Sequence, residues 1–288
     1  MPISNIQPSD TMNILLHTIA LEPNRWQPAR VSTPLASYLD KIASAGFNTL
    51  EVFQPHLDLA PDLTEILDGL AHFQLDAHVL SAYVKLGAPA DQEAEIDAEF
   101  ERIAEYINDF GFRKIRLFPG SVPDGDTPKA TAQRVELRWK KLLSLCPEVV
   151  LLIETHNASL ADDFQLIYRL VAKQKDPRIQ LLFQPVIFQS APTIQQFQIQ
   201  KKLIGHIHLQ DRDPDMKLVP FGSSASTIPW KEILIALNFA VDASIEFVPS
   251  SITPIDQFSI AKTLEEISQT RNTILTWDSE ARGHLLRP

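Results

Sequence analysis

The stretch Leu203-Ile204-Gly205-His206-Ile207-His208-Leu209-Gln210-Asp211-Arg212-Asp213 has the pattern of a short buried β-strand that ends in charged and metal-binding side chains. His206 and His208 stand two residues apart, so on a strand their side chains point to the same face. Asp211 and Arg212 follow where the strand is expected to run out into a loop. An apolar strand with charge at its carboxyl end is typical of a catalytic strand in an α/β barrel. The alternative is that both histidines are buried and hydrogen-bonded to the backbone.

Short apolar runs of this kind recur along the whole chain and alternate with longer segments of helical periodicity. The predicted strands cover Asn13–Thr18, Thr49–Gln54, Asp76–Leu80, Lys114–Phe118, Glu148–Glu154, Ile179–Phe183, Gly205–Leu209 and Ala243–Val248. Eight strands that alternate with helices, without a change in composition, predict an α/β protein built as a single (β/α)8 TIM barrel over residues 1–288. We expect residues 1–11 to be an N-terminal extension and residues 279–288 to be a C-terminal tail.

Composition narrows the class of protein. The chain has 288 residues, of which 44% are hydrophobic, and this is enough for one large core. Its net charge is -10 and it has no run of Lys and Arg, which argues against a nucleic-acid partner because phosphate contacts need a basic face. The single cysteine, Cys146, excludes a disulfide framework and a cysteine-based zinc site.

The sequence also gives no sign of a membrane protein. No run approaches the roughly 18 apolar residues that a membrane-spanning helix needs. Residues 1–11 lack the apolar segment of a signal peptide. We therefore expect a cytoplasmic protein with no membrane partner.

In a parallel barrel the carboxyl ends of all strands meet at one mouth. Glu154 and Glu246 are expected there, each inside an otherwise apolar strand. Burying an unpaired carboxylate costs several kcal/mol, so each glutamate needs a metal, a cation or a proton. Two glutamates with a histidine between them in strand order indicate a site for a divalent ion. The alternative is an internal salt bridge, for instance with Arg116.

Two long connections also reach the expected mouth. Residues 184–200 are rich in Gln and Pro, and we expect a long loop that leads into a short helix. Residues 211–227 end in the small residues Gly222–Thr227, which before a helix amino terminus could hold a phosphate or a sugar oxygen. The alternative is an ordinary surface loop.

The chain resembles the xylose isomerase-like TIM barrels, the sugar phosphate isomerase/epimerase superfamily, over nearly its whole length. The resemblance lies in the segments Gly46–Glu51, Ile153–His156, His206–Asp211 and Ser244–Phe247. Such barrels hold a metal with a Glu, an Asp, a His and a Glu from strands five to eight. The resemblance implies that the matching residues, Glu154, Gln184, His208 and Glu246, hold the metal here.

The resemblance also implies substrate contacts. Arg212 and His156 match residues that lie near the substrate in many members, and the other candidates for substrate binding at the mouth are Arg116, His17, His56 and Glu51. Strand six departs from the pattern, because Gln184 and Ile187 stand where the family often has Asp and His. We expect a weaker metal site and no catalysis through the missing histidine.

The leading hypothesis is an isomerase or epimerase of carbohydrate metabolism that acts on a sugar or another small hydroxy-carbonyl compound. A divalent metal (Mn, Mg, Co or Zn) would polarise the carbonyl. Glu154 and Glu246 would move the proton beside it through an enediolate, Arg212 would stabilise the negative charge, and His156 would orient hydroxyl groups.

Three other functions remain open. The departure at Gln184 and Ile187 fits a barrel that has lost catalysis and binds a sugar-like ligand or a partner. A dehydratase or lyase would use the same metal chemistry, and an AP-endonuclease-like enzyme would share the fold. The charge of -10 argues against the last of these. The resemblance also implies a homodimer or homotetramer.

Overall fold

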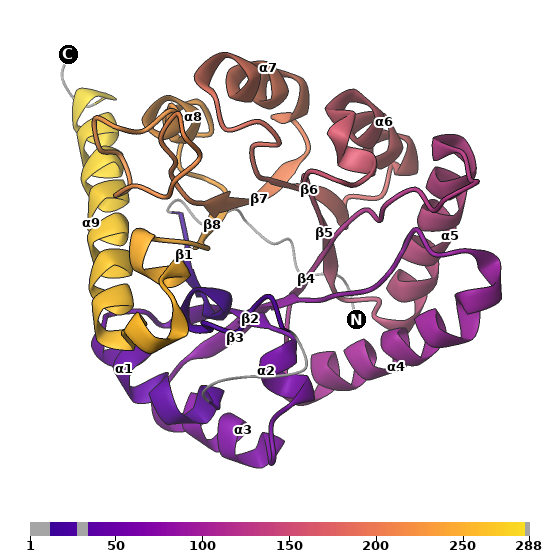
Figure 1. Cartoon of the computed structure of the whole chain (residues 1–288), viewed down its shortest axis with the longest axis horizontal. Coiled ribbons are helices and arrows are strands. Elements are labelled where there is room, and N and C mark those ends of the chain that lie inside the picture. Colours follow the sequence, from indigo (N-terminus) through magenta and orange to yellow (C-terminus); the bar gives the residue numbers. More distant parts are fainter. Residues whose placement is uncertain (1–11, 28–33, 286–288) are drawn as a thin grey trace.

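The computed structural model describes residues 12–27 and 34–285, and within these ranges eight parallel strands close into a barrel surrounded by helices (Figure 1). The strands are β1 (Ile14–His17), β2 (Thr49–Phe53), β3 (Asp76–Ser81), β4 (Lys114–Leu117), β5 (Val150–Glu154), β6 (Ile179–Phe183), β7 (Ile204–Leu209) and β8 (Asp242–Ile245). Their order around the barrel follows the sequence, and β1 closes the ring by pairing with β8. The predicted (β/α)8 barrel is confirmed.

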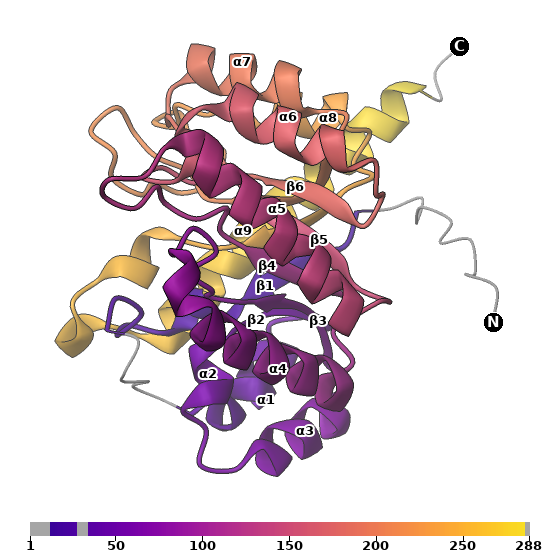
Figure 2. The ribbon, with the colours of Figure 1, turned by 90° about the vertical axis from the view of Figure 1, so that its right-hand side faces the viewer.

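The helices of the described residues form the outer layer. They are α1 (Leu39–Ser44), α2 (Pro55–Asp58), α3 (Leu63–His72), α4 (Glu93–Phe110), α5 (Pro128–Leu145), α6 (Phe164–Gln174), α7 (Ser190–Gln200), α8 (Trp230–Ala236) and α9 (Ile260–Leu285). The pairs α4 and α5, and α6 and α7, lie side by side (Figure 2). The Thr127 hydroxyl accepts a hydrogen bond from the Ala130 amide and begins α5, while Gly111 ends α4 in the left-handed conformation.

The two expected terminal segments, residues 1–11 and 279–288, can be compared with the structure in part. The N-terminal extension expected at residues 1–11 lies outside the described residues. Helix α9 continues to Leu285, so most of the segment expected as a tail is helical. No helix within residues 12–27 and 34–285 has the length and apolar character needed to cross a bilayer.

The two faces of each strand divide the core into two parts. One face packs outward against the helices; Leu16, Ile153 and Ile207 belong to this large cluster. The other face points into the barrel, where Leu15, Val79, Leu152 and Leu182 form a separate apolar plug. Because side chains alternate along a strand, the residues two positions after the plug also point inward, one layer nearer the carboxyl ends.

That next layer is polar. It contains His17 two residues after Leu15, and Glu154 two residues after Leu152. Strands β7 and β8 add His208 and Ser244, which are paired with each other in the register of the sheet. The upper half of the barrel interior is therefore the place where the fold gathers ionisable groups.

The strand boundaries differ slightly from the predicted ones, and one difference concerns a site residue. Glu246 was expected inside strand eight, but β8 ends at Ile245. The Glu246 amide still donates to the Leu209 carbonyl at 3.0 Å, which is the last contact between the two strands. The chain then enters a 3-10 turn at Pro249–Ile252. Glu246 therefore stands on the rim of the barrel.

A second group of charges closes the opposite, amino-terminal end of the barrel. The Lys114 ammonium lies 2.6 Å from the Asp242 carboxylate and 3.5 Å from the Gly205 carbonyl oxygen. His78 Nε2 lies 3.5 Å from the same carboxylate. Burial raises the pKa of Asp242, but His78 and Lys114 lower it by more, so the pKa lies well below its usual range.

We expect Asp242→Asn to reduce the free energy of unfolding by about 2 kcal/mol at neutral pH, because Lys114 loses its charged acceptor. The folded pKa of Asp242 lies below the unfolded value of about 3.9, so this stability is present above that pH and is lost as the pH falls further. Urea unfolding at neutral pH and near pH 3 measures this difference in the free energy of unfolding, with the exposed substitution Asp124→Asn as the control. An equal loss at both pH values would contradict the assignment.

Candidate functional site

Glu51 is the centre of the polar layer inside the barrel. Its carboxylate lies 3.0 and 3.1 Å from His208 Nε2, 3.3 Å from His17 Nε2 and 3.6 Å from His206 Nε2. All four side chains are completely buried. Burial raises the pKa of Glu51, but the histidine rings around it, those of His17 and His208 first, lower it by more, and the pKa lies well below its usual range. Glu51 is therefore an ionised carboxylate that accepts hydrogen bonds from His208 Nε2.

The hydrogen bonds of these rings define their orientation. The Ile19 amide donates to His17 Nδ1 at 3.3 Å, so the proton of the neutral His17 ring is on Nε2, toward Glu51. His206 Nε2 lies 2.7 Å from the Ser244 hydroxyl. Burial lowers the pKa of His206 to about 4 and that of His17 well below its usual value. Both rings are therefore neutral at physiological pH.

His208 links two groups of acids through its two nitrogens. Nε2 is bonded to Glu51, whereas Nδ1 faces Glu246 Oε1 at 3.6 Å and Glu154 Oε2 at 3.8 Å. Burial lowers the pKa of His208, but the charges of Glu51, Glu246 and Glu154 raise it to about 9. The ring thus supplies a positive charge that the three acids share.

Arg116 is the second cation of the layer. Its Nε lies 2.9 Å from Glu154 Oε2, and its Nη2 donates to the Tyr83 hydroxyl at 3.1 Å. The guanidinium also lies over the Phe118 ring, 4.3 Å from the ring centroid. The internal salt bridge considered for Glu154 is therefore present, at 1% exposure of both side chains.

Glu246 is held by amides. Gln210 Nε2 donates to Glu246 Oε2 at 2.7 Å and to Gln184 Oε1 at 3.2 Å. Arg212 in turn donates to Gln210 Oε1 from Nε at 3.0 Å and from Nη2 at 2.8 Å. Burial raises the pKa of Glu246 to about 7, although the nearby His208 charge lowers it. Gln184, Glu246 and Arg212 thus form one chain through Gln210.

Three atoms suited to metal binding converge between these groups. One ligand atom each from Glu154, His208 and Glu246 lie within 4.8 Å of one another. Within the described part of the chain, both oxygens of Glu154 and Nδ1 of His208 are buried without a hydrogen-bond partner. Carboxylate oxygen and imidazole nitrogen suit several divalent metals. The residues therefore fit a metal ion, and we call them the ligand cluster. One ligand atom each from His17, Glu51 and His208 also lie within 4.8 Å of one another.

The bond from His208 Nε2 to Glu51 strengthens this fit. A ligating histidine usually donates its other ring N–H to a carboxylate, which fixes the ring and leaves the first nitrogen free to bind the metal. When His208 is neutral, Glu51 holds its proton on Nε2, so that Nδ1 presents a lone pair to the ligand cluster.

Two expected site residues lie away from the ligand cluster. His56 is buried, with Nδ1 at 3.0 Å from the Thr18 hydroxyl and Nε2 at 3.1 Å from the Tyr38 hydroxyl. His156 is partly exposed above Glu154, and its ring packs against Phe118 with centroids 4.9 Å apart.

Sequence reasoning missed Gln210, Tyr83 and Arg25 as site residues. Gln210 stands two residues after His208, so strand alternation could have identified it. Arg25 comes from the connection after β1; it is 5% exposed, its Nε donates to the Ile19 carbonyl at 3.2 Å, and its charge acts on Glu246. No pattern in the sequence places Arg25 or Tyr83 near the acids.

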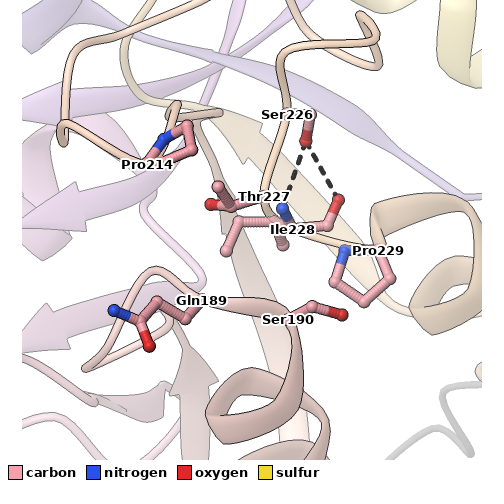
Figure 3. Close-up of a pocket in the computed structure, with 7 residues that line it drawn as sticks. All are labelled: Gln189, Ser190, Pro214, Ser226, Thr227, Ile228 and Pro229. Atoms are coloured by element: carbon pink, nitrogen blue, oxygen red, sulfur yellow. Dashed lines mark hydrogen bonds between the residues drawn. The ribbon is translucent and has the colours of Figure 1, made fainter.

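The small residues of the connection after β7 line a pocket of about 420 Å³ (Figure 3). Of these small residues Ser226 and Thr227 line the pocket, and their hydroxyls are already used within the protein. Ser226 donates to Asp211 and to the Ile228 carbonyl, and the Thr227 hydroxyl lies 2.9 and 3.0 Å from two backbone carbonyls. These bonds fasten the loop, and they favour the structural interpretation of this segment over a phosphate site.

The profile of the family described as xylose isomerase-like TIM barrel matches residues 39–243. This match covers more than half of the chain, and the chain belongs to the xylose isomerase-like TIM barrel family. Comparison with curated protein sequences gives no significant match.

Several solved structures share the fold. A fusion protein of a xylose isomerase-like TIM barrel and 4-hydroxyphenylpyruvate dioxygenase matches 96% of this chain, which spans 44% of the fusion protein, at 14% identity and a TM-score of 0.67. The IOLI protein with a zinc atom matches at 15% identity and a TM-score of 0.70, over 94% of this chain and 99% of that protein. D-Psicose 3-epimerase of Clostridium cellulolyticum H10, solved with D-tagatose, matches at 14% identity and a TM-score of 0.65, over 91% of this chain and 98% of that protein.

We expect Arg116→Met to reduce the free energy of unfolding by about 3–5 kcal/mol in the presence of a chelator, because it leaves Glu154 as a buried unpaired acid. Adding Glu154→Leu to this variant should recover part of the loss. Urea unfolding of the two single variants and the double variant gives the coupling energy directly. Losses that simply add would show that the two charges do not stabilise each other.

Proposed function

We propose that this protein is a divalent-metal-dependent isomerase or epimerase of a sugar or another small hydroxy-carbonyl compound. The observation that carries the proposal is the ligand cluster: one ligand atom each from Glu154, His208 and Glu246 converge in the upper half of the barrel, and His208 Nδ1 has no hydrogen-bond partner there among the residues that the structure describes. Sugar epimerases among the structures of the same fold support this substrate class. The neighbour solved with zinc supports a metal in such a barrel.

The metal would be held by Glu154, His208 and Glu246, with the Gln184 carbonyl as a neutral fourth ligand. A bound divalent ion supplies Lewis-acid polarisation of the substrate carbonyl. For Gln184 to bind as well, its Oε1 has to exchange the bond from Gln210 for the metal. The site carries one negative charge fewer than a site with Asp at this position, so we expect moderate affinity.

The proton transfers would be made by the two glutamates. Glu154 and Glu246 stand on strands five and eight, with His208 between them, so a substrate held over His208 has one carboxylate on each side. One carboxylate removes the proton next to the carbonyl, and the other returns a proton to the neighbouring carbon or the opposite face. Arg212 and Arg116 supply positive charge where the substrate becomes negative.

A second candidate function is a sugar-binding barrel without catalysis. The observation that favours it is the ion pair of Arg116 with Glu154 at 2.9 Å, which places a cation on one of the ligand oxygens. In this case Arg116 replaces the metal, and the chain binds its ligand in the metal-free form.

We expect the purified chain to bind about one equivalent of Mn, Mg, Co or Zn, with a rise in melting temperature that depends on metal concentration. Glu246→Ala should abolish both effects. Glu51→Gln should weaken metal binding about 10- to 100-fold, because the charged acceptor that orients His208 becomes a neutral amide. Gln184→Asp should strengthen binding, because it restores the missing charge. Elemental analysis and melting curves with each metal measure these effects.

The exposed Glu148→Gln serves as the control and should bind metal as the unchanged protein does. No bound metal and no shift in melting temperature would favour the sugar-binding barrel over the enzyme.

We expect the metal-loaded protein to exchange the proton next to the carbonyl of an accepted sugar with solvent deuterium, which NMR follows directly. Glu154→Gln and Glu246→Gln should each slow this exchange by at least about 100-fold, because each removes one of the two groups that carry the proton. Glu148→Gln should exchange at the normal rate. Full turnover by either active-site variant would overturn the assignment of the two acids.

A further inference from the structure

We propose that the substrate is a glycoside of two units, in which the carbonyl-bearing unit lies against the ligand cluster and the second glycosyl unit occupies a separate pocket beside it. This proposal rests on the proposed function and names its substrate class. The pocket, here called the outer pocket, has a volume of about 580 Å³ and lies among the connections after β3, β4 and β5. Such a volume is in the range of sites for small organic ligands.

Two side chains just after β4 and β5 relate the outer pocket to the ligand cluster. Phe118 stands two residues after Arg116, and His156 stands two residues after Glu154. Because side chains alternate along a strand, Phe118 and His156 lie one layer above the ion pair. The contact of Phe118 with the Arg116 guanidinium at 4.3 Å confirms this stacking. Phe118 and His156 both line the outer pocket, so the pocket begins directly above Glu154.

The lining of the outer pocket suits a sugar ring. The Phe118 ring offers an apolar surface for the C–H face of a pyranose, and polar groups stand around it. His156 Nδ1 lies 2.7 Å from the Asn157 carbonyl oxygen, to which it donates, so Nε2 is left as an acceptor for a hydroxyl group. Ser121, Asn157 and Lys85 add a hydroxyl, an amide and an ammonium.

The wall of the outer pocket is rigidly built. Gly87 allows the connection after β3 to touch the connection after β4, because a Cβ there would lie 2.1 Å from the Ser121 carbonyl oxygen. Arg138 is 2% exposed and donates to the Leu86 and Ala88 carbonyls at 2.7 and 2.6 Å. Arg134 donates to the Gly87 carbonyl at 3.0 Å from the same helix. A wall fixed before the ligand arrives lowers the entropic cost of binding.

A single sugar at the ligand cluster would leave this space empty, since Glu154, His208 and Glu246 do not line it. The arrangement therefore selects for a ligand longer than one sugar unit. In this arrangement the glycosidic link would pass over Arg116 and Phe118, on the side of Glu154.

The test is calorimetric binding to the full chain with added Mn, with matched sugars as probes. D-Fructose is compared with lactulose, maltulose and isomaltulose, and D-glucose with cellobiose and maltose. At least one disaccharide should bind about tenfold or more tightly than its monosaccharide. Ser121→Trp and Asn157→Trp, which fill the outer pocket from exposed positions, should each remove this advantage without changing monosaccharide binding.

Ser279→Trp on α9 introduces the same bulk away from the pocket and should leave both affinities unchanged. If no disaccharide binds more tightly than its monosaccharide, or if the tryptophan variants weaken both ligands equally, the proposal is wrong. The measured affinity does not depend on turnover, so the result is distinct from that of the proton-exchange test. A protein that binds the disaccharide as expected but never exchanges a proton would contradict only the proposed function.

Discussion

One buried carboxylate, that of Glu51, determines the charge of the whole upper barrel. It accepts from His208 at 3.0 Å, lies 3.3 Å from His17 Nε2 and 3.6 Å from His206, and is itself fully buried. An ion in such a place is costly unless its charge is compensated. His208 donates hydrogen bonds to both oxygens of Glu51, and the rings of His17 and His206 lie beside them. Glu51 therefore compensates the buried charge of His208, while the His206 ring is bonded to the Ser244 hydroxyl.

The ligand cluster depends on this arrangement. With Nε2 of His208 bonded to Glu51, the opposite nitrogen faces Glu154 and Glu246. The remaining acids are held from outside, Glu154 by Arg116 and Glu246 by Gln210. Glu154 and Glu246 therefore each have a partner on the outer side, and each faces His208 Nδ1 on the inner side. The proposed metal site rests on this geometry, and the apolar plug lies beneath it.

The sequence was sufficient for the architecture because the barrel repeats one simple pattern. Eight apolar runs predict the eight strands. Glu154 at the end of the apolar run Val150–Glu154 predicts a buried acid that needs a partner. The contact between Glu51 and His208 cannot be predicted from the sequence, because these residues are 157 positions apart and meet only when the barrel closes. The same applies to Arg25 and Tyr83, which loops bring to the site without a periodic signal. Glu246 was placed correctly at the mouth, but the end of β8 depends on the last bond to Leu209, which composition does not reveal.

His17 takes part both in the turn after β1 and in the polar layer around Glu51. Its Nδ1 accepts the Ile19 amide and so begins the 3-10 turn Thr18–Leu21, while its Nε2 faces Glu51. The ring therefore joins the first connection above the barrel to the residue that orients His208. A displacement of that connection would alter the bonding of Glu51, and a change at His208 would be felt in the connection. Thermodynamic linkage of this kind is reciprocal. If the ligand cluster binds a metal as proposed, a ligand that stabilises the turn after β1 changes the metal affinity, and the metal changes the affinity for that ligand by the same factor.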